Sequence, residues 1–492
     1  MWTRSQRNFA MQWLAVMMNL VAVMFVAGEQ CSAPVVTTSL GEARGFCMHT
    51  RKGHSIAAFT SVPYALPPIG DLRFKPCVQR NPYIRQKEIV GDEDCLYLNI
   101  YVPDAHLRAR DEKKPLPVMV FVHGGGWMCG DSTVDSYGPE LLLDRDVLLV
   151  TLNYRLGPLG FLSTQDEVCP GNNGLKDQQE ALRFVQRHIH NFGGDNRSVT
   201  IFGESAESPP GEALRQAFRL AKFLGCPQAP SWRMIECLRT RDSYEIIDTE
   251  FMYYEWDYEP MTPFKAVVEP DLPEAFLTRP PRAPRTSPAP PWLMGLNRDE
   301  GCLKIAPLTF YYENSPHAYV ITRILRERYL NQLDELSTQQ AIRQAVHLAL
   351  NSSTVYLYEL AYRASNSFSQ VFGDPHGDYG VCHADELMHL FPIRFLSEPV
   401  SERDLAISEL ILTLWTNFAT TGDPNKPLPL PTEWKPARTG SRLEYLVIDE
   451  QPTMQQGFAN QAALWGRLPL WHTLTDVNTQ THEHTNRFYD EL

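Results

Sequence analysis

The stretch that decides the fold runs Val199-Thr200-Ile201-Phe202-Gly203-Glu204-Ser205-Ala206-Glu207. Its first four residues predict a strand, and the next five follow the pattern G-x-S-x-G except at the last position. In that pattern a serine lies on a sharp turn between a strand and a helix, and small neighbours let the turn pack closely. Here Glu207 replaces the second glycine. The next residues, Ser208-Pro209-Pro210, disfavour a helix.

The sequence around this turn predicts strands alternating with helices. Short apolar runs rich in β-branched residues are typical of strands buried on both faces, and apolar residues at helical spacing predict amphipathic helices. The predicted strands are 118–122, 147–150, 199–202, 292–296 and 355–358, and the predicted helices are 175–191 and 405–418. Strand, helix, strand and turn in this order predict an α/β fold with a mostly parallel central sheet flanked by helices.

Composition and the N-terminal segment indicate the compartment. The chain has 492 residues and a formal net charge of -13, without a Lys/Arg-rich run, which argues against nucleic-acid binding. Residues 1–28 contain Arg4 and Arg7, then a long uncharged apolar run, which predicts a secretory signal peptide; an uncleaved membrane anchor is the alternative. A secreted protein without a stable membrane partner is expected. The C-terminal Tyr489-Asp490-Glu491-Leu492 lacks the usual first residue of an ER-retention signal.

Ten cysteines in a chain that enters the secretory route predict disulfides more readily than metal ligands. Two local pairs are plausible, Cys226 with Cys237 and Cys77 with Cys95. The sequence does not pair the others, which are Cys31, Cys47, Cys129, Cys169, Cys302 and Cys382. Asn196 and Asn351 begin N-x-S triplets that predict glycosylation.

An activated serine needs a histidine that takes its proton and an acid that orients the histidine. With this type of turn, the chain order is serine, acid, histidine, so the search is limited to residues after Ser205. Glu300 follows a predicted strand, and His383 lies near Gly380 in a predicted loop. Asp299 is the rival acid and His376 the rival base, although His376 lies in a turn-like cluster that is typical of a surface loop. The histidine spacing does not favour a metal site, and no cofactor is predicted.

A developing oxyanion needs backbone N–H donors, and glycines allow the backbone to approach closely. His123-Gly124-Gly125-Gly126-Trp127 directly follows the predicted strand 118–122. Gly124 and Gly125 are the predicted donors from this loop, and Ala206 is the third. Glycine-rich turns after strands are common, so this loop indicates an oxyanion loop only in combination with the Ser205 turn.

Together these motifs resemble the type-B carboxylesterases, the cholinesterase-like family of α/β-hydrolases, and most of all the secreted esterases of insects. The shared motifs are Pro63-Tyr64-Ala65 with Pro67-Pro68, Glu93-Asp94-Cys95-Leu96-Tyr97-Leu98-Asn99, the His123 loop, Asn153-Tyr154-Arg155, Asn172-Asn173-Gly174-Leu175 with Asp177-Gln178, the Ser205 turn, Asp299-Glu300-Gly301 and Gly380-Val381-Cys382-His383. The resemblance implies one catalytic domain at 29–475 and a tail at 476–492. It also implies a Ser205, Glu300 and His383 triad, hydrolysis of small carboxylic esters, and disulfides Cys77–Cys95 and Cys226–Cys237.

The chain departs from this family after the Ser205 turn. A helix and a strand that the resemblance leads one to expect there are missing, because Glu207 leads through two prolines into Gly211. The region before Cys77 and the stretch 337–356 also look shortened. The alternative expectation is therefore a catalytically impaired or silent member, similar to the adhesion proteins of the family or to a truncated isoform.

Substrate signals are weaker. Choline-binding members carry a tryptophan in the first disulfide loop, and no tryptophan lies between Cys77 and Cys95. Juvenile-hormone esterases usually have glutamine where Glu204 stands. An uncharged carboxylic ester is the expected substrate, and the oligomeric state is left open.

Overall fold

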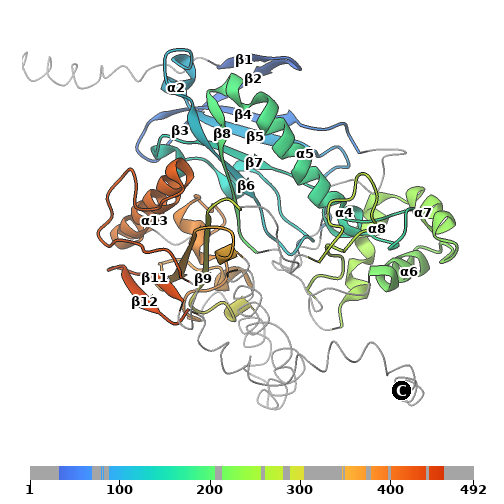
Figure 1. Ribbon diagram of the computed structural model, residues 1–492. Helices are drawn as coiled ribbons and strands as arrows, with labels where there is room; N and C mark the ends of the chain where they lie inside the picture. Colours follow the sequence, from blue (N-terminus) through green and yellow to red (C-terminus); the bar gives the residue numbers. More distant parts are fainter. Residues whose placement is uncertain are drawn as a thin grey trace, which may run out of the picture.

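The computed structural model describes most of the catalytic domain that the sequence predicts (Figure 1). The described residues are 33–68, 79, 81, 88–205, 213–255, 261–280, 289–303, 346, 349–372, 378–396, 400–438 and 443–458. The predicted signal peptide, the tail, Cys77, His376 and the junction residues 206–212, with Ala206 and Glu207, lie outside them.

A six-stranded sheet forms the centre of the molecule, in the order β3-β4-β5-β7-β6-β8. Its strands are β3 (Phe46–His49), β4 (Ser55–Pro63), β5 (Tyr97–Pro103), β6 (Leu116–Val122), β7 (Leu148–Leu152) and β8 (Gly194–Gly203). The pairs β3·β4, β4·β5 and β5·β7 are antiparallel, whereas β7·β6 and β6·β8 are parallel. A separate hairpin of β1 (Val35–Thr38) and β2 (Gly41–Arg44) precedes the sheet.

The apolar runs at 118–122 and 147–150 are central strands, as the sequence predicts. Every residue of β7 is buried, and Val118 to Phe121 of β6 are at most 1% exposed. Burial on both faces explains why these strands are continuously apolar and lack the alternation of a half-exposed strand.

A second sheet of four strands has the order β12-β11-β10-β9. Its strands are β9 (Trp292–Asn297), β10 (Val355–Leu360), β11 (Glu444–Ile448) and β12 (Thr453–Gln456). The β9·β10 and β10·β11 pairs are parallel, and β12 is antiparallel to β11. The structure thus confirms an α/β fold with mostly parallel pairing around the site.

The two sheets do not join through hydrogen bonds between the described strands. β8 pairs with β6 on one side, β9 pairs with β10, and no described strand lies between β8 and β9 along the chain. Ile201, two residues before the end of β8, is 56% exposed. The described residues of that interval form helices: α6 (Ala213–Phe223), α7 (Ser231–Arg239), α8 (Ser243–Asp248) and η4 (Thr249–Tyr253). This division lies where the sequence predicts a missing strand.

Side-chain packing connects the sheets instead. Helix α13 (Glu402–Thr421) contacts β6 and β8, and its Trp415 contacts Tyr358 of β10 with ring centroids 5.0 Å apart. Phe391 contacts Phe121 of β6 at 4.7 Å and stacks on Phe202 of β8 at 6.2 Å. These side chains belong to one buried cluster or pack against it, so a common core spans the division.

The remaining described helices are short, apart from α5. They are α2 (Asp104–Arg108), α3 (Val134–Tyr137), η2 (Leu142–Asp144), α4 (Gly157–Phe161), α5 (Asn173–His188), η3 (Ile189–Phe192), α12 (Ser369–Phe372) and η6 (Asp385–His389). Helix α5 matches the predicted helix 175–191, except that its last turn becomes η3. None of the helices in the described part of the chain has the length and apolar character needed to span a bilayer.

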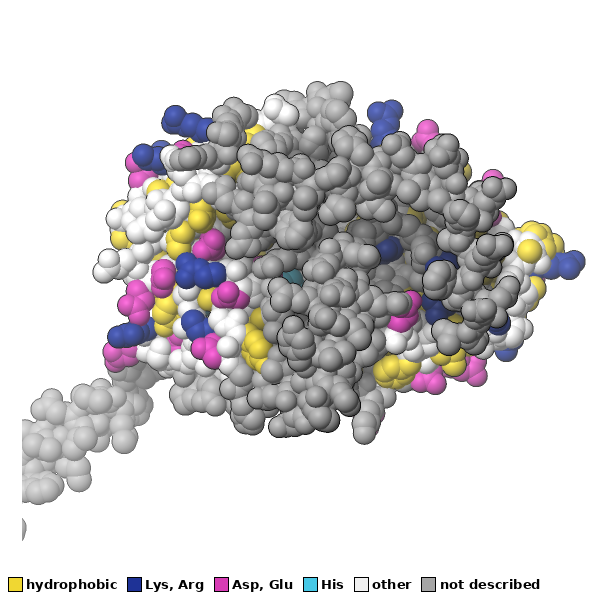
Figure 2. All heavy atoms as spheres, turned by 90° about the horizontal axis from the view of Figure 1, so that it is seen from below, with side chains coloured by type: hydrophobic (Ala, Val, Ile, Leu, Met, Phe, Trp, Pro, Cys, Tyr) yellow, Lys and Arg dark blue, Asp and Glu magenta, His cyan; other side chains and the backbone are white. Residues whose placement is uncertain are grey.

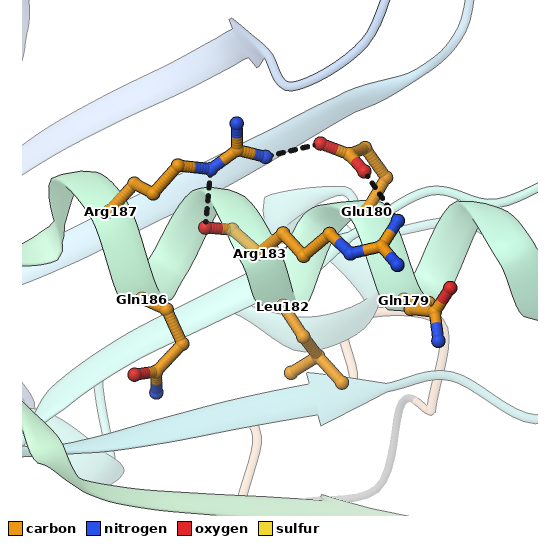
Figure 3. A pocket seen from close by; sticks show the side chains of 6 residues that line it. All are labelled: Gln179, Glu180, Leu182, Arg183, Gln186 and Arg187. Atoms are coloured by element: carbon orange, nitrogen blue, oxygen red, sulfur yellow. Dashed lines mark hydrogen bonds and ion pairs between the residues drawn. The ribbon is translucent and has the colours of Figure 1, made fainter.

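Helix α5 has one exposed, charged face and one buried face. On the exposed face, Glu180 accepts a hydrogen bond from Arg183 at 3.1 Å and another from Arg187 (Figure 3). On the buried face, Asp177 forms an ion pair with Arg155, and both side chains are nearly inaccessible to solvent. The shallow hollow drawn in Figure 3 belongs to the exposed face and is lined by residues of this helix alone.

The disulfides agree with one predicted pair and add an unexpected one. Cys226 is bonded to Cys237, as the sequence predicts. Cys95 is disulfide-bonded, while its predicted partner Cys77 lies outside the described residues. Cys302 is bonded to Cys382, a pair that the sequence left unassigned because 80 residues separate them.

The two glycosylation triplets lie in different surroundings. Asn351 is exposed on the turn before β10. Asn196 lies within β8, and its side-chain amide donates a hydrogen bond to the backbone oxygen of Gln186 at 2.9 Å. The exposed turn at Asn351 therefore leaves more room for a glycan than the strand at Asn196.

Candidate active site

The serine turn and the glycine-rich loop leave the six-stranded sheet at the same edge. β6 and β8 run in parallel with Val122 opposite Gly203, so the residues that follow these strands meet. Ser205 has φ of 62° in the left-handed region, which is unfavourable for a residue with a Cβ. The structure therefore gives Ser205 the strained turn that the G-x-S-x-G pattern predicts.

The glycine-rich loop approaches the serine turn closely. A Cβ at Gly124 would lie 2.5 Å from the backbone oxygen of Glu204 and 3.1 Å from the Cβ of Ser205. Gly125 has φ of +100°, and a Cβ there would collide with the backbone oxygen of Cys129. Glycine is therefore required at both positions by space or by backbone conformation.

His383 contacts Ser205 with one ring nitrogen and Glu300 with the other. Its Nε2 lies 3.0 Å from Ser205 Oγ, and its Nδ1 lies 2.6 Å from Glu300 Oε2. Glu300 is further fixed by the backbone N–H of Asn297, which donates to Oε1 at 2.8 Å. The structure thus brings together the serine, acid and base that the sequence singled out.

The rival acid Asp299 has a different contact. Its Oδ2 accepts a hydrogen bond from the backbone N–H of Val381 at 2.9 Å, and its own N–H donates to the Val381 oxygen at 2.9 Å. Asp299 therefore joins the two loops that carry Glu300 and His383, and of these two rival acids it is Glu300 that contacts the imidazole. The rival base His376 lies outside the described residues.

Glu204 also contacts the imidazole, which the sequence did not reveal. Its Oε1 lies 2.9 Å from His383 Nε2, so this carboxylate and the Ser205 hydroxyl meet the same nitrogen. Burial lowers the pKa of His383, but the nearby carboxylates of Glu204 and Glu300 outweigh this effect and raise the pKa well above 6.5. The two carboxylates therefore stabilise the imidazolium form of His383.

Glu386 is a third carboxyl group whose charge interacts with those of Glu204 and Glu300. Burial, together with the charges of Glu204 and Glu300, raises the pKa of Glu386 to about 8. Its Oε2 accepts a hydrogen bond from Asn297 Nδ2 at 2.6 Å. A protonated Glu386 places no further negative charge beside His383. Glu386 stands three residues after His383, but this spacing alone does not show that the charge of Glu204 acts on the Glu386 carboxyl group.

Comparison with known proteins identifies the relatives of this arrangement. The model of the Carboxylesterase family matches residues 32–89, 75–209, 207–320 and 308–465. A juvenile hormone esterase of Tribolium castaneum is 31% identical, over 80% of this chain and 84% of that protein. A carboxylic ester hydrolase of Bombus ignitus is 32% identical, over 90% of this chain and 94% of that protein.

A solved structure supports the fold. The crystal structure of juvenile hormone esterase from Manduca sexta, with OTFP covalently attached, superposes with a TM-score of 0.72 at 23% identity. The superposition covers 90% of this chain and 100% of that chain. The family match extends over most of the sequence, from the first described strand to the last. The chain therefore belongs to the carboxylesterase family, which includes the carboxylic ester hydrolases.

Proposed function

We propose that the chain hydrolyses small, uncharged carboxylic esters through an acyl-enzyme on Ser205, with His383 as general base and Glu300 as orienting acid. The observation that carries the proposal is the continuous path from Ser205 Oγ to His383 Nε2 and from His383 Nδ1 to Glu300 Oε2, at 3.0 Å and 2.6 Å. These lengths lie within the range for proton transfer between a nucleophile and its base.

The reaction follows from this path. His383 Nε2 accepts the Ser205 proton as Oγ bonds to the ester carbonyl carbon, and it then gives that proton to the leaving alkoxide. Water repeats the sequence on the acyl-enzyme and releases the carboxylic acid. The N–H groups of Gly124 and Gly125 are the proposed oxyanion donors, because this loop lies against the Ser205 turn. Ala206 is the proposed third donor.

The test uses the full chain and a matched serine variant. We expect the purified protein to hydrolyse p-nitrophenyl esters and to be labelled at Ser205 by an organophosphate, which forms a stable bond to an activated serine hydroxyl. Ser205→Ala should abolish both the labelling and the turnover that depends on it. A folded wild-type chain that neither turns over nor is labelled would refute the proposal.

A second candidate is a catalytically impaired member of the family. It is favoured by the division of the sheet after β8 and by the division of the family match at 207–209, where Glu207 and Pro209 stand. The alignment with the Bombus ignitus protein spans 540 positions yet covers 90% of the 492 residues, so that relative has segments without a counterpart here. Peptide mass spectrometry across 202–218 tests this candidate, because a longer native peptide would remove its basis.

Glu204→Gln is expected to shift the acid limb of the pH profile of kcat/KM to lower pH. The general base must be neutral, and the Glu204 carboxylate favours the charged form of His383. An uncharged amide removes part of that effect, so less alkaline conditions suffice to deprotonate the base. The measurement is kcat/KM for a p-nitrophenyl ester from about pH 5 to 9. Glu180→Gln makes the same charge change on the exposed face of α5 and should leave the acid limb where it is in the wild type. An unchanged acid limb in Glu204→Gln would contradict the effect assigned to the Glu204 carboxylate.

We also propose secretion and an acidic, non-nucleic-acid-binding surface. The predicted signal peptide and the exposed Asn351 triplet support secretion. On the face seen in Figure 2, acidic and basic side chains of the described residues are interspersed, and these residues form no continuous basic stripe there for a phosphate backbone. A small-molecule ester is the proposed partner of the site.

A further inference from the structure

The Cys302–Cys382 disulfide lies beside both members of the acid–base pair. Cys302 follows Glu300 by two residues, and Cys382 directly precedes His383. Both cysteines are almost fully buried, and their Cα atoms are 5.4 Å apart. The covalent bond therefore joins the acid loop to the base loop within two residues of each functional side chain.

These two loops lack the support of a strand ladder. The register of β9 and β10 ends with Asn297 opposite Leu360, and the segment 378–384 that carries His383 belongs to no described strand. Three hydrogen bonds connect the loops. The Asp299 N–H donates to the Val381 oxygen, the Val381 N–H donates to Asp299 Oδ2, and Asn297 Nδ2 donates to the Cys382 oxygen at 2.7 Å. The disulfide is the covalent part of this connection.

Each half of the disulfide is also fixed within its own loop. The N–H of Cys302 donates to the Asp299 oxygen at 3.0 Å, and the N–H of Cys382 donates to Asp385 Oδ2 at 2.8 Å. A displacement of one loop is therefore passed to the other through the sulfur atoms. We infer that Cys302 and Cys382 form a positioning pair that holds Glu300 and His383 in register for ester hydrolysis, an inference that rests on the proposed function.

The second described disulfide supplies a matched control. Cys226 and Cys237 are 11 residues apart and join the segment after α6 to α7. Helices α6 and α7 lie on the opposite side of the molecule from β9 and α13 (Figure 1). Removing either disulfide removes one covalent link, but only the Cys302–Cys382 bond spans the acid and base loops. A comparison of the two double variants thus separates positioning from general loss of a cross-link.

The test compares Cys302→Ala/Cys382→Ala with Cys226→Ala/Cys237→Ala and wild type on p-nitrophenyl acetate. We expect the first variant to lose about 10- to 100-fold in kcat, since a displacement of about 1 Å can cost about 10²-fold. KM should stay close to wild type, and the acid limb of the pH profile should move to lower pH because Glu300 no longer supports the imidazolium fully. The control should retain wild-type kcat and pH profile. A folded first variant with unchanged kcat and acid limb would overturn the inference.

Two further measurements keep the outcomes distinct. If the first variant does not fold, the wild type is treated with a water-soluble phosphine, which takes up oxygen from water as each disulfide becomes two thiols. Alkylation and mass spectrometry then show which disulfide has opened. Activity that falls with opening of Cys302–Cys382 supports the inference, and activity that persists after that opening refutes it. Turnover by the wild type itself tests the proposed function. If turnover is absent, an NMR titration of His383 with and without the disulfide still tests positioning. An unchanged His383 titration would refute the inference.

Discussion

A Glu300→Gln variant is expected to lose about 10⁴-fold in kcat for ester hydrolysis while its KM changes little. Glu300 Oε2 accepts a hydrogen bond from His383 Nδ1 at 2.6 Å, which leaves Nε2 as the nitrogen that can take the Ser205 proton. A glutamine amide can instead donate to Nδ1. That contact would place the imidazole proton on Nε2, facing the serine, where the nitrogen can no longer act as a base. Steady-state kinetics with a p-nitrophenyl ester measure the loss.

Two matched variants sharpen this prediction. Glu300→Asp keeps the carboxylate on a shorter side chain and should lose less activity than Glu300→Gln. Glu359→Gln makes the same chemical change on β10, where the carboxylate pairs with Arg298 at 3.1 Å, and should leave kcat unchanged. A Glu300→Gln variant that keeps more than about a tenth of wild-type kcat would show that another acid orients the base.

Asp177→Ala should lower the free energy of unfolding by about 3–5 kcal/mol. Arg155 and Asp177 are 5% and 3% exposed, and Asp177 also accepts the backbone N–H of Arg155 at 3.1 Å. Removal of the carboxylate leaves the guanidinium charge buried with its main counter-ion gone, and a buried charge without compensation is costly. Urea unfolding followed by circular dichroism measures the change.

Glu180→Ala is the control for this stability effect, because it lies on the same helix three residues later. Its carboxylate pairs with exposed Arg183 and Arg187, where water screens the interaction (Figure 3). We expect a change of at most about 1 kcal/mol. Equal effects of Asp177→Ala and Glu180→Ala would mean that burial of the ion pair contributes little.

Continuous apolar runs predict several strands well, both in the buried centre of the six-stranded sheet and in half-buried β9. The run at 118–122 lies in β6, and the prediction 292–296 matches β9 to within one residue. The helix predicted at 405–418 is longer in the structure and begins at Glu402, where Ser401 and Asp404 form a capping box. That cap was not used in the prediction, although both residues are visible in the sequence.

Contacts between distant segments were harder to predict from one sequence. The catalytic candidates Ser205, Glu300 and His383 each lie in a recognisable local motif, whereas the contact of Glu204 with His383 depends on how two loops meet in space. The Cys302–Cys382 pair has the same origin, since its cysteines carry no local spacing signal and meet because the acid and base loops meet. Ala206 and Glu207 keep the role that the sequence assigned to them as a prediction, because they lie outside the described residues.

The division of the sheet also changes the mechanics of the active site. Ser205 and the glycine-rich loop are attached to the six-stranded sheet, whereas Glu300 follows β9 of the four-stranded sheet and is cross-linked to the His383 loop. A small shear between the sheets would therefore change the distance from serine to imidazole more than the distance from imidazole to Glu300. Phe391 packs against Phe121 and Phe202 of the six-stranded sheet, and Trp415 packs against Tyr358 of the four-stranded sheet, so aromatic contacts on both sides oppose this shear. In a continuous sheet, backbone hydrogen bonds between neighbouring strands would oppose such a shear. Between these two sheets, packed aromatic side chains take over that role.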